Sequence, residues 1–475
     1  TAEDVIFNGT VGQTLDLGII DITGNLDLNA DIGNTGGVAG AASLDVSGTT
    51  DLGADVTTVG AQVYGGVTTI SADSILATTD TAITFNNTIV GDLSDDDLTI
   101  NIGTGIVQFK GTVGAGGGNN DVGAIAITGG LNLDAAITSA ASLTVSTTSN
   151  LGASVTTSGL QTYTQAVTLS AGNTLTSSGT GALTFTAAVD SDSTARALIT
   201  STGGNTTFNA AVGGTAALSG LESTTAAFNA KAIKVGGTID ITNSATSTIT
   251  GIISDGASAA ALTKDGAGSL TLRGVNTYTG NTTITNGNLA IDGAGQLGSG
   301  TYAGLISIGA SDRLFYSSSE EQTLSGVISG SGGVTKDSNT TSTLTLTADN
   351  TFTGGLTVSA GTVVLSGSLD SAITLAANTT FTVTADITNT SVISATANDG
   401  SVASNSTINM PINLVNGQYL LWADGADNAS DISNINSALT DNILIDYVGS
   451  DDGNDTRITG TNKTTASISS SISST

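Results

Sequence analysis

The chain contains no histidine and no cysteine among its 475 residues. Serine–histidine–aspartate and cysteine–histidine catalysis are therefore excluded, as are disulfides and metal sites with imidazole ligands. Basic residues are also scarce, with 10 lysines and arginines against 40 aspartates and glutamates, which gives a formal charge of −30. Because binding to phosphate needs clustered basic side chains, the composition argues against nucleic acid and anionic membrane surfaces as partners.

Proline occurs once, aromatic residues make up 4% of the chain, and runs typical of long helices are missing. No apolar run reaches the length of about 20 residues that a membrane-spanning helix needs. The chain is instead rich in glycine, with 63 residues, and in valine, isoleucine, leucine, threonine and serine. Since β-branched residues favour strands, we expect an all-β protein. The acidic residues either keep its surface soluble or bind divalent cations.

Internal repeats are the strongest signal in the sequence. The stretch LGADVTTVGAQVY matches LGASVTTSGLQTY, which aligns Tyr64 with Tyr163 at an offset of 99 residues. A shorter signature, FNGTVG with its variants FKGTVG and FNAAVG, begins at Phe7, Phe109 and Phe208. The N-terminal part therefore consists of units of roughly 100 residues, used twice in full and once in degraded form.

The local pattern within the repeats is short strands that alternate apolar residues with threonine, serine, asparagine or aspartate. Two architectures fit this pattern, a string of β-sandwich domains and a parallel β-helix solenoid. Three features favour a right-handed parallel β-helix of about 20 to 25 residues per coil. Proline is nearly absent, no linker-like segment separates the units, and the expected inward residues are small.

A second repeat family contains the motifs NTYTG and NTFTG, offset by 74 residues. The motif positions are Asn276, Tyr278 and Gly280 in the first copy and Asn350, Phe352 and Gly354 in the second. In a β-helix these residues would occupy equivalent corners of different coils, where asparagine ladders and stacked aromatic rings stabilise the structure. The alternatives are that the asparagines and glycines serve separate hairpin turns, and that the repeated aromatic residues form an exposed surface for sugars.

The first copy, LTKDGAGSLTLRGVNTYTGNTTITNGNLAID at residues 262–292, resembles the passenger-associated repeat of bacterial autotransporters. The second copy departs from the pattern at Val334, Ser338 and Phe352. The N-terminal repeats more loosely resemble large filamentous surface adhesins, and the acidic, repeat-rich chain resembles rickettsial-type outer-membrane and surface-layer proteins. The resemblance implies a β-helix passenger that is exported across the bacterial outer membrane and found on the cell surface or outside the cell.

The C-terminal part resembles the hairpin-rich cap with which such passengers often end. Apolar segments flank Asn416 and Gly417, which predicts one hairpin, and residues 443–460 predict another. Ile432, Ile435 and Leu439 have helical spacing and predict a short helix. The predicted domains are a β-helix of degenerate repeats at 1–250, a β-helix with passenger-associated repeats at 251–400, a cap at 401–460 and a Ser/Thr-rich tail at 461–475.

Few residues are candidates for chemistry. The stretch GSDDGNDTR supplies carboxylates that favour Ca²⁺, so Asp451, Asp452 and Asp455 are candidate calcium ligands, unless they form only a hairpin tip. We expect no other cofactor. The predicted function is non-enzymatic: a rigid acidic rod that acts in adhesion, or as a surface coat or filament. Its partners would be a receptor or glycan of a host or neighbouring cell, or further copies of itself. The alternative is a polysaccharide-cleaving β-helix enzyme that uses residues 95–97, three consecutive aspartates.

Overall fold

The computed structural model describes residues 4–12, 17–33, 40–92, 96–114, 121–337, 342–369, 371, 373–376 and 378–384, followed by six short strands up to residue 462. The chain forms two compact units, one of Thr1–Thr238 with Gly256–Ser258 and the other of Ile239–Asp255 with Ala259–Thr475. The predicted domain boundaries at residues 250, 400 and 460 were drawn from the type of repeat and not from compactness. The division into two units does not test them, so they stay predictions. Apart from the 3₁₀ turn η1 (Gly298–Gly300), the described elements are all strands.

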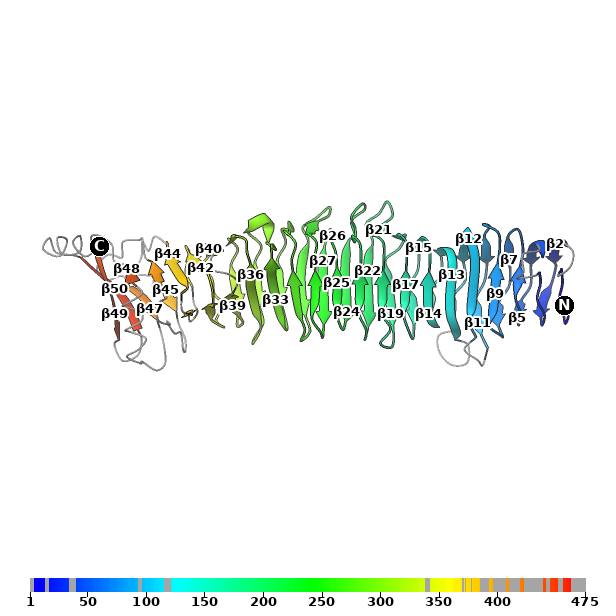
Figure 1. The fold of residues 1–475 in the computed structure, drawn as a ribbon, viewed down its shortest axis with the longest axis horizontal. Coiled ribbons are helices and arrows are strands. Elements are labelled where there is room, and N and C mark those ends of the chain that lie inside the picture. Colours follow the sequence, from blue (N-terminus) through cyan, green and yellow to red (C-terminus); the bar gives the residue numbers. More distant parts are fainter. Residues whose placement is uncertain are drawn as a thin grey trace. The chain divides into compact units, whose positions relative to one another are not determined.

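The first unit is a parallel β-solenoid with three strand positions in each coil, which we call faces I, II and III (Figure 1). Face I comprises β1 (Asp4–Phe7), β3 (Asn25–Leu28), β5 (Thr50–Leu52), β8 (Thr68–Ile70), β11 (Ile89–Gly91), β16 (Val155–Thr157), β19 (Asn173–Ser177), β22 (Ala197–Thr202) and β24 (Gly220–Thr225). Single bridges through Val113 and Ile137 connect β11 to β16.

Face II comprises β2 (Leu17–Ile22), β4 (Ala41–Val46), β7 (Gln62–Tyr64), β10 (Ile83–Phe85), the C-terminal parts of β12 (Leu98–Phe109) and β13 (Val122–Leu133), then β15 (Ser149–Leu151), β18 (Val167–Leu169), β21 (Val189–Ser191) and β26 (Ile233–Val235). Face III comprises β6 (Val56–Thr57), β9 (Ser74–Ala77), the N-terminal parts of β12 and β13, then β14 (Ala140–Val145), β17 (Gln161–Tyr163), β20 (Leu183–Phe185), β23 (Thr206–Phe208) and β25 (Phe228–Ala230).

The pairing confirms the predicted parallel β-helix. Leu143 pairs with Gln161, Gln161 with Leu183, and Leu183 with Thr206, at offsets of 18, 22 and 23 residues. The ladders described for this unit are parallel, whereas a sandwich is built from antiparallel strands, so the sandwich alternative is wrong. Inward and outward residues alternate as predicted: in β17, Gln161 and Tyr163 are buried and Thr162 between them is half-exposed.

The repeated phenylalanine signature lies on a different face in each copy. Phe7 is on face I, Phe109 on face II and Phe208 on face III. Tyr64 and Tyr163, the aligned tyrosines, likewise lie on faces II and III. The repeat of roughly 100 residues therefore does not correspond to a whole number of coils, and each copy is displaced by one face from the copy before it.

Stacked aromatic rings fill the interior of the first unit. One ladder contains Tyr64, Phe85 and Phe109, with ring centroids 4.8 and 5.5 Å apart. The other contains Tyr163, Phe185, Phe208 and Phe228, with successive centroids 5.1, 4.6 and 5.8 Å apart. Because these rings are buried, they belong to a core whose other members are mostly leucine, isoleucine and valine, and the exposed sugar surface considered for the repeated aromatic residues is wrong.

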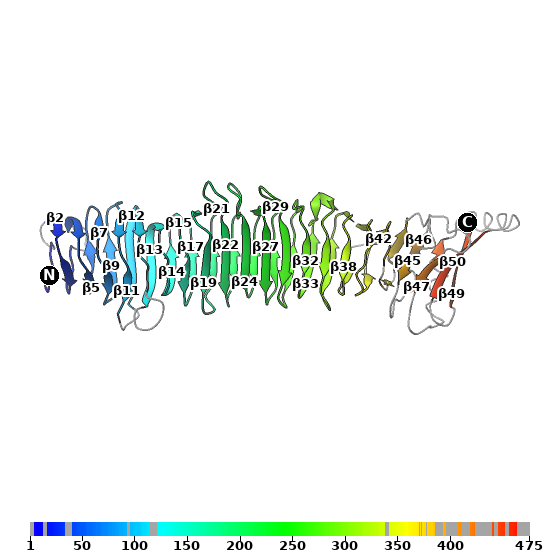
Figure 2. The same cartoon turned by 180° about the vertical axis from the view of Figure 1, so that it is seen from behind.

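The second unit is also a parallel β-solenoid, with faces IV, V and VI (Figure 2). Face IV comprises β28 (Ser247–Ile249), β31 (Ser269–Leu272), β33 (Asn288–Gly293), β36 (Arg313–Ser318), β39 (Gly333–Lys336), β41 (Leu356–Val358) and β43 (Ile373–Leu375). Face V comprises β27 (Thr238–Asn243), β30 (Ala261–Asp265), β32 (Thr282–Ile284), β35 (Ile306–Ile308) and β38 (Ile328–Gly330). Face VI comprises β29 (Ile253–Asp255), β34 (Thr301–Tyr302), β37 (Gln322–Leu324), β40 (Thr343–Leu346), β42 (Thr362–Leu365), β44 (Thr380–Val383), β46 (Thr407–Asn409) and β48 (Leu439–Thr440).

The last strands include two antiparallel pairs. Strand β47 (Tyr419–Trp422) pairs in parallel with β45 (Ile393–Ala395). Strand β50 (Thr456–Asn462) pairs antiparallel with both β47 and β49 (Ile445–Asp451). The hairpin predicted for residues 443–460 is therefore confirmed.

Two other predictions for the cap have different outcomes. Asn416 and Gly417, the centre of the other predicted hairpin, lie outside the described residues. The predicted helix is wrong at its end, because Leu439 belongs to β48 and pairs in parallel with Ile408 of β46. Ile432 and Ile435 lie outside the described residues.

Candidate functional site

The asparagines of the NTYTG and NTFTG motifs are buried and bind the main chain. Asn276 Oδ1 accepts a hydrogen bond of 2.9 Å from the Ile253 amide, and its Nδ2 donates to the carbonyl oxygens of Gly274 and Gln296. Asn350 makes similar bonds: its Oδ1 accepts from the Ile328 amide of the preceding coil at 2.9 Å, and its Nδ2 donates to Ala348 O at 2.8 Å. Each amide thus satisfies main-chain groups at a corner where the coil has no strand.

The two motifs do not stack on one another. The Thr277 amide donates to Ile253 O, which places the first motif on face VI, and the Thr351 amide donates to Ile328 O, which places the second on face V. The corners are alike in hydrogen bonding but lie on different faces. The expected asparagine ladder is therefore wrong, because each side chain is committed to the backbone of a neighbouring coil.

The aromatic and glycine positions of the motifs also serve the coil. Tyr278 and Phe352 are 0% exposed. The Tyr278 hydroxyl shares a hydrogen bond of 2.7 Å with Thr282 Oγ1, and burial raises its pKa well above the ordinary value. A Cβ atom at Gly280 would lie 2.3 Å from Ala260 O, and one at Gly354 would lie 2.4 Å from the carbonyl carbon of Gly332. Only glycine allows this close approach of adjacent coils.

Two buried lysines were not recognised as special from the sequence. Lys264 of β30 is 0% exposed, and its Nζ donates to the carbonyl oxygens of Asp265, Gly266 and Asn286 at 2.7, 2.7 and 3.0 Å. Burial lowers the pKa of Lys264 to about 8, although the carboxylates of Asp265 and Asp312 act in the opposite direction. Its aligned counterpart Lys336 is equally buried, and its Nζ lies 5.8 Å from the centroid of the Tyr316 ring.

Of the three aspartates considered for catalysis, Asp97 takes part in structural hydrogen bonds. Asp97 Oδ1 accepts a hydrogen bond of 2.6 Å from the Ala124 amide, and the Asp97 amide donates to Asp73 Oδ1 at 2.9 Å. Asp95 lies outside the described residues. Within the described ranges, no three acidic side chains converge as a metal site would require. Asp451 is described only as part of the backbone of β49, and Asp452 and Asp455 lie outside the described residues, so the calcium site stays a prediction.

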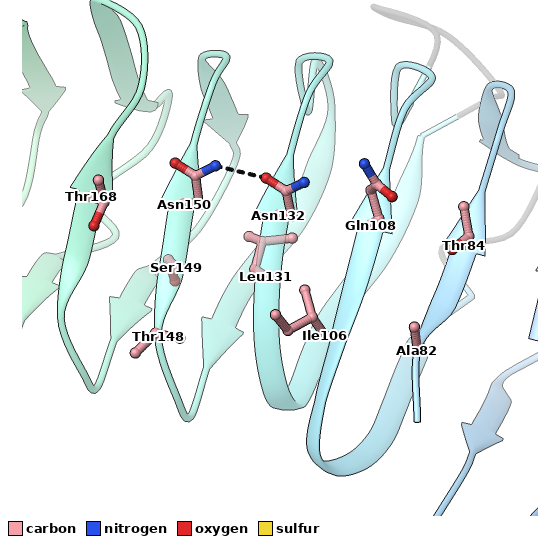
Figure 3. Close-up of a pocket in the computed structure, with 10 residues that line it drawn as sticks. All are labelled: Ala82, Thr84, Ile106, Gln108, Leu131, Asn132, Thr148, Ser149, Asn150 and Thr168. Carbon is pink, nitrogen blue, oxygen red and sulfur yellow. Dashed lines mark hydrogen bonds between the residues drawn. The ribbon is translucent and has the colours of Figure 1, made fainter. Parts of the chain in front are cut away.

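A groove lies on the outer side of face II, over strands β10, β12, β13, β15 and β18 (Figure 3). Its volume is about 450 Å³. Outward side chains of successive coils line it, among them Gln108, Asn132 and Asn150. Asn150 Nδ2 donates to Asn132 Oδ1 at 2.8 Å, and Gln108 Nε2 donates to Asp134 Oδ2 at 2.7 Å. The groove thus presents a row of amides on adjacent coils.

The groove forms where the solenoid is irregular. Strands β12 and β13 are each 12 residues long and run through both face III and face II. The register between them shifts from Asn101 to Ile106, and Ile106 is left 51% exposed within the groove. Nothing in the sequence pointed to this site, because its amides occupy the same outward positions that threonine and asparagine occupy elsewhere in the chain.

The parallel β-solenoid with short internal repeats and NTYTG-type corners fits one class of protein, the β-helix passengers of autotransporters. The model of the passenger-associated-transport-repeat family matches residues 262–291 and 341–365, and these repeats and the solenoid fit an autotransporter passenger. The second match begins after Val334 and Ser338, where the second copy departs from the pattern. Neither a curated protein nor a solved structure matches the chain. Within the described ranges, no helix has the length and apolar character needed to cross a membrane.

Proposed function

We propose that the chain is a non-enzymatic passenger that is exported across the bacterial outer membrane and acts at the cell surface or outside the cell. Its role is adhesion to a receptor or glycan of a host or neighbouring cell, with a structural coat or filament as the second role of the same scaffold. The narrower resemblance to rickettsial-type surface proteins stays a prediction. Calcium bound at Asp451, Asp452 and Asp455 is part of this proposal as its one cofactor.

One observation carries the proposal: the polar residues of the repeats are used to build the coil. Asn276, Asn350 and Lys264 donate to main-chain carbonyls of their own solenoid, and Asp97 accepts from a main-chain amide. These side chains are engaged within the fold, which supports a scaffold whose outward positions carry the function. The formal charge of −30 keeps such a scaffold soluble and argues against nucleic acid as a partner.

The test uses the purified chain labelled with a fluorophore. We expect it to bind to intact host or neighbouring cells, saturably and in competition with unlabelled chain. Negative-stain microscopy with and without calcium would reveal the coat or filament role as ordered arrays. A chain that neither binds cells nor assembles under either condition would contradict the proposal.

The enzymatic alternative has its own test. Asp95, Asp96 and Asp97 are replaced together by asparagine, and the release of reducing ends from polysaccharides is measured for both proteins. We expect no release from either protein, because Asp97 already accepts the Ala124 amide. Release by the natural chain that is lost in the triple variant would replace the adhesive proposal with a polysaccharide-cleaving enzyme.

A further inference from the structure

We infer that the groove over face II binds an uncharged, extended oligosaccharide that runs along the first unit with one sugar unit per coil. This inference rests on the proposed adhesive function and names the class of partner and the site. In this groove, outward amides, hydroxyls and an exposed apolar side chain occur together.

The register of the strands fixes the spacing of the amides. Gln108 pairs with Asn132, and Asn132 with Asn150, so the three side chains point outward from successive coils. Thr84 and Thr168 extend the same row by one coil at each end. Neighbouring parallel strands lie about 4.8 Å apart. This spacing is close to the length of one unit in an extended polysaccharide chain, so consecutive sugars meet consecutive members of the row.

The hydrogen-bonding capacity of the row suits sugar hydroxyls. After the bond between Asn150 Nδ2 and Asn132 Oδ1, the pair retains donor capacity at Asn132 Nδ2 and acceptor capacity at Asn150 Oδ1. Thr84 and Thr168 add hydroxyl groups that donate and accept. A sugar hydroxyl also donates and accepts, so the remaining amide groups and the hydroxyls can both be satisfied by one ligand.

An apolar surface accompanies the polar row. Ile106 is an exposed isoleucine within the groove, with Ala82 beside it in the lining. Ligand sites combine apolar side chains with a few placed polar groups, and the C–H faces of a sugar ring are complementary to Ile106 and Ala82. Ile106 points outward because it precedes the buried Val107 in the alternation of β12.

The uncharged lining of the groove favours an uncharged ligand. The described residues that line the groove include no lysine, arginine, aspartate or glutamate. By contrast, the groove around Asp4, Asp27 and Asp51 is lined by carboxylates, and the one beside η1 includes Glu321. An acidic glycan would find no basic partner in the face II groove and would be repelled by a chain of charge −30. The lining also lacks the pair of carboxylates that glycoside hydrolysis uses, so we expect binding without cleavage.

The test measures binding of neutral linear oligosaccharides, cello-, chito- and malto-oligosaccharides from disaccharide to hexasaccharide, by isothermal titration calorimetry with the full chain. We expect at least one series to bind, with affinity that rises with length and levels off once the groove is filled. The double variant Asn132→Ala/Asn150→Ala should lose at least about tenfold in affinity. The matched control Asn229→Ala removes an outward amide from the middle of β25 on face III and should leave binding unchanged.

A second variant distinguishes loss of the binding site from loss of the fold. Ile106→Glu keeps every amide and adds a carboxylate to the groove, and it too should abolish binding of the neutral series while circular dichroism stays unchanged. The inference is overturned if no neutral oligosaccharide binds, if the amide variants bind as well as the natural chain, or if extended peptides bind in their place. Cell binding that is equal for the natural chain and the double variant would overturn this site alone and leave the adhesive proposal standing.

Discussion

The Tyr163 hydroxyl donates a hydrogen bond of 3.1 Å to Gln161 Oε1 in the interior of the first unit. Tyr64 and Gln62 form the same bond at 2.9 Å in the preceding copy of the repeat. In both copies the glutamine Nε2 donates to two main-chain carbonyls and a threonine hydroxyl. The repeat therefore carries a buried polar network along with its strand pattern, in which both the glutamine amide and the tyrosine hydroxyl are paired.

Tyr163→Phe should reduce the free energy of unfolding by about 1–3 kcal/mol, because Gln161 Oε1 would remain buried without a donor. Tyr64→Phe should cost a similar amount. The measurement is urea denaturation followed by circular dichroism. Replacing both partners, as in Gln161→Leu with Tyr163→Phe, should recover part of the loss, since no unpaired acceptor remains. A double variant less stable than Tyr163→Phe would contradict this account.

Phe185→Ala should destabilise the first unit by about 3–5 kcal/mol, as large-to-small changes in packed cores do. Phe185 lies between two rings, 5.1 Å from Tyr163 and 4.6 Å from Phe208, so the change opens a cavity in the middle of the ladder. Hydrogen exchange should show lost protection first at β17, β20 and β23. Uniform loss of protection over distant coils would mean that the ladder does not stabilise its neighbours locally.

Gly280→Ala should lower the melting temperature, because the new methyl group would meet Ala260 O at 2.3 Å and the backbone of the neighbouring coil cannot move away freely. Gly172→Ala is the matched control, since the nearest atom to a Cβ there is Ala197 O at 3.8 Å. We expect the control to be neutral or to gain up to about 1 kcal/mol from the less flexible unfolded chain. Equal loss in both variants would show that close coil contact is not the reason for glycine in NTYTG.

Lys264 should make stability depend on pH in a defined window. Its pKa is about 8 in the folded chain against an ordinary value of 10.5. Between these values the unfolded chain binds more protons than the folded one, so the contribution of Lys264 to the free energy of unfolding rises with pH. The penalty of the buried charge is present in full below pH 8 and disappears above 10.5.

The measurement compares urea midpoints of the natural chain and Lys264→Met from pH 7 to 9.5. We expect the difference between them to change in favour of the natural chain as the pH rises. The comparison stops below pH 10, because burial raises the pKa values of Tyr64 and Tyr163, and ionisation of these tyrosines in the unfolded chain then lowers stability. A difference that stays constant over the window would contradict a lowered pKa for Lys264.

The fold class could be predicted because the alternation of apolar and polar residues between glycine-rich turns indicates short strands. Repeats without prolines or linkers indicate a continuous ladder of main-chain hydrogen bonds. The face on which each copy lies did not follow. Coils differ in length, as the offsets of 18 and 23 residues show, so an offset of 99 residues does not reveal a position around the coil. The handedness of the solenoid stays a prediction.

The predictions for individual residues failed for a different reason. Asparagine at a repeated corner suggested a ladder, but an amide can equally bind a main-chain amide and carbonyl, and Asn276 does so. The sequence did not single out Lys264 as buried, because lysine is rarely buried, and the three carbonyl oxygens around its Nζ explain the exception. The groove lies beside a register shift between Asn101 and Ile106, which the alternation of residue types does not predict.

The displacement of each repeat copy by one face has a consequence for valency. Phe7, Phe109 and Phe208 begin the same signature on three different faces, so duplication has lengthened the first unit without creating a row of identical epitopes along any one of them. A receptor that approaches one face of the first unit therefore meets only one copy of the repeat in a given orientation. Avidity in such a protein must come from many chains displayed side by side, since the copies within one chain cannot engage the same partner surface together.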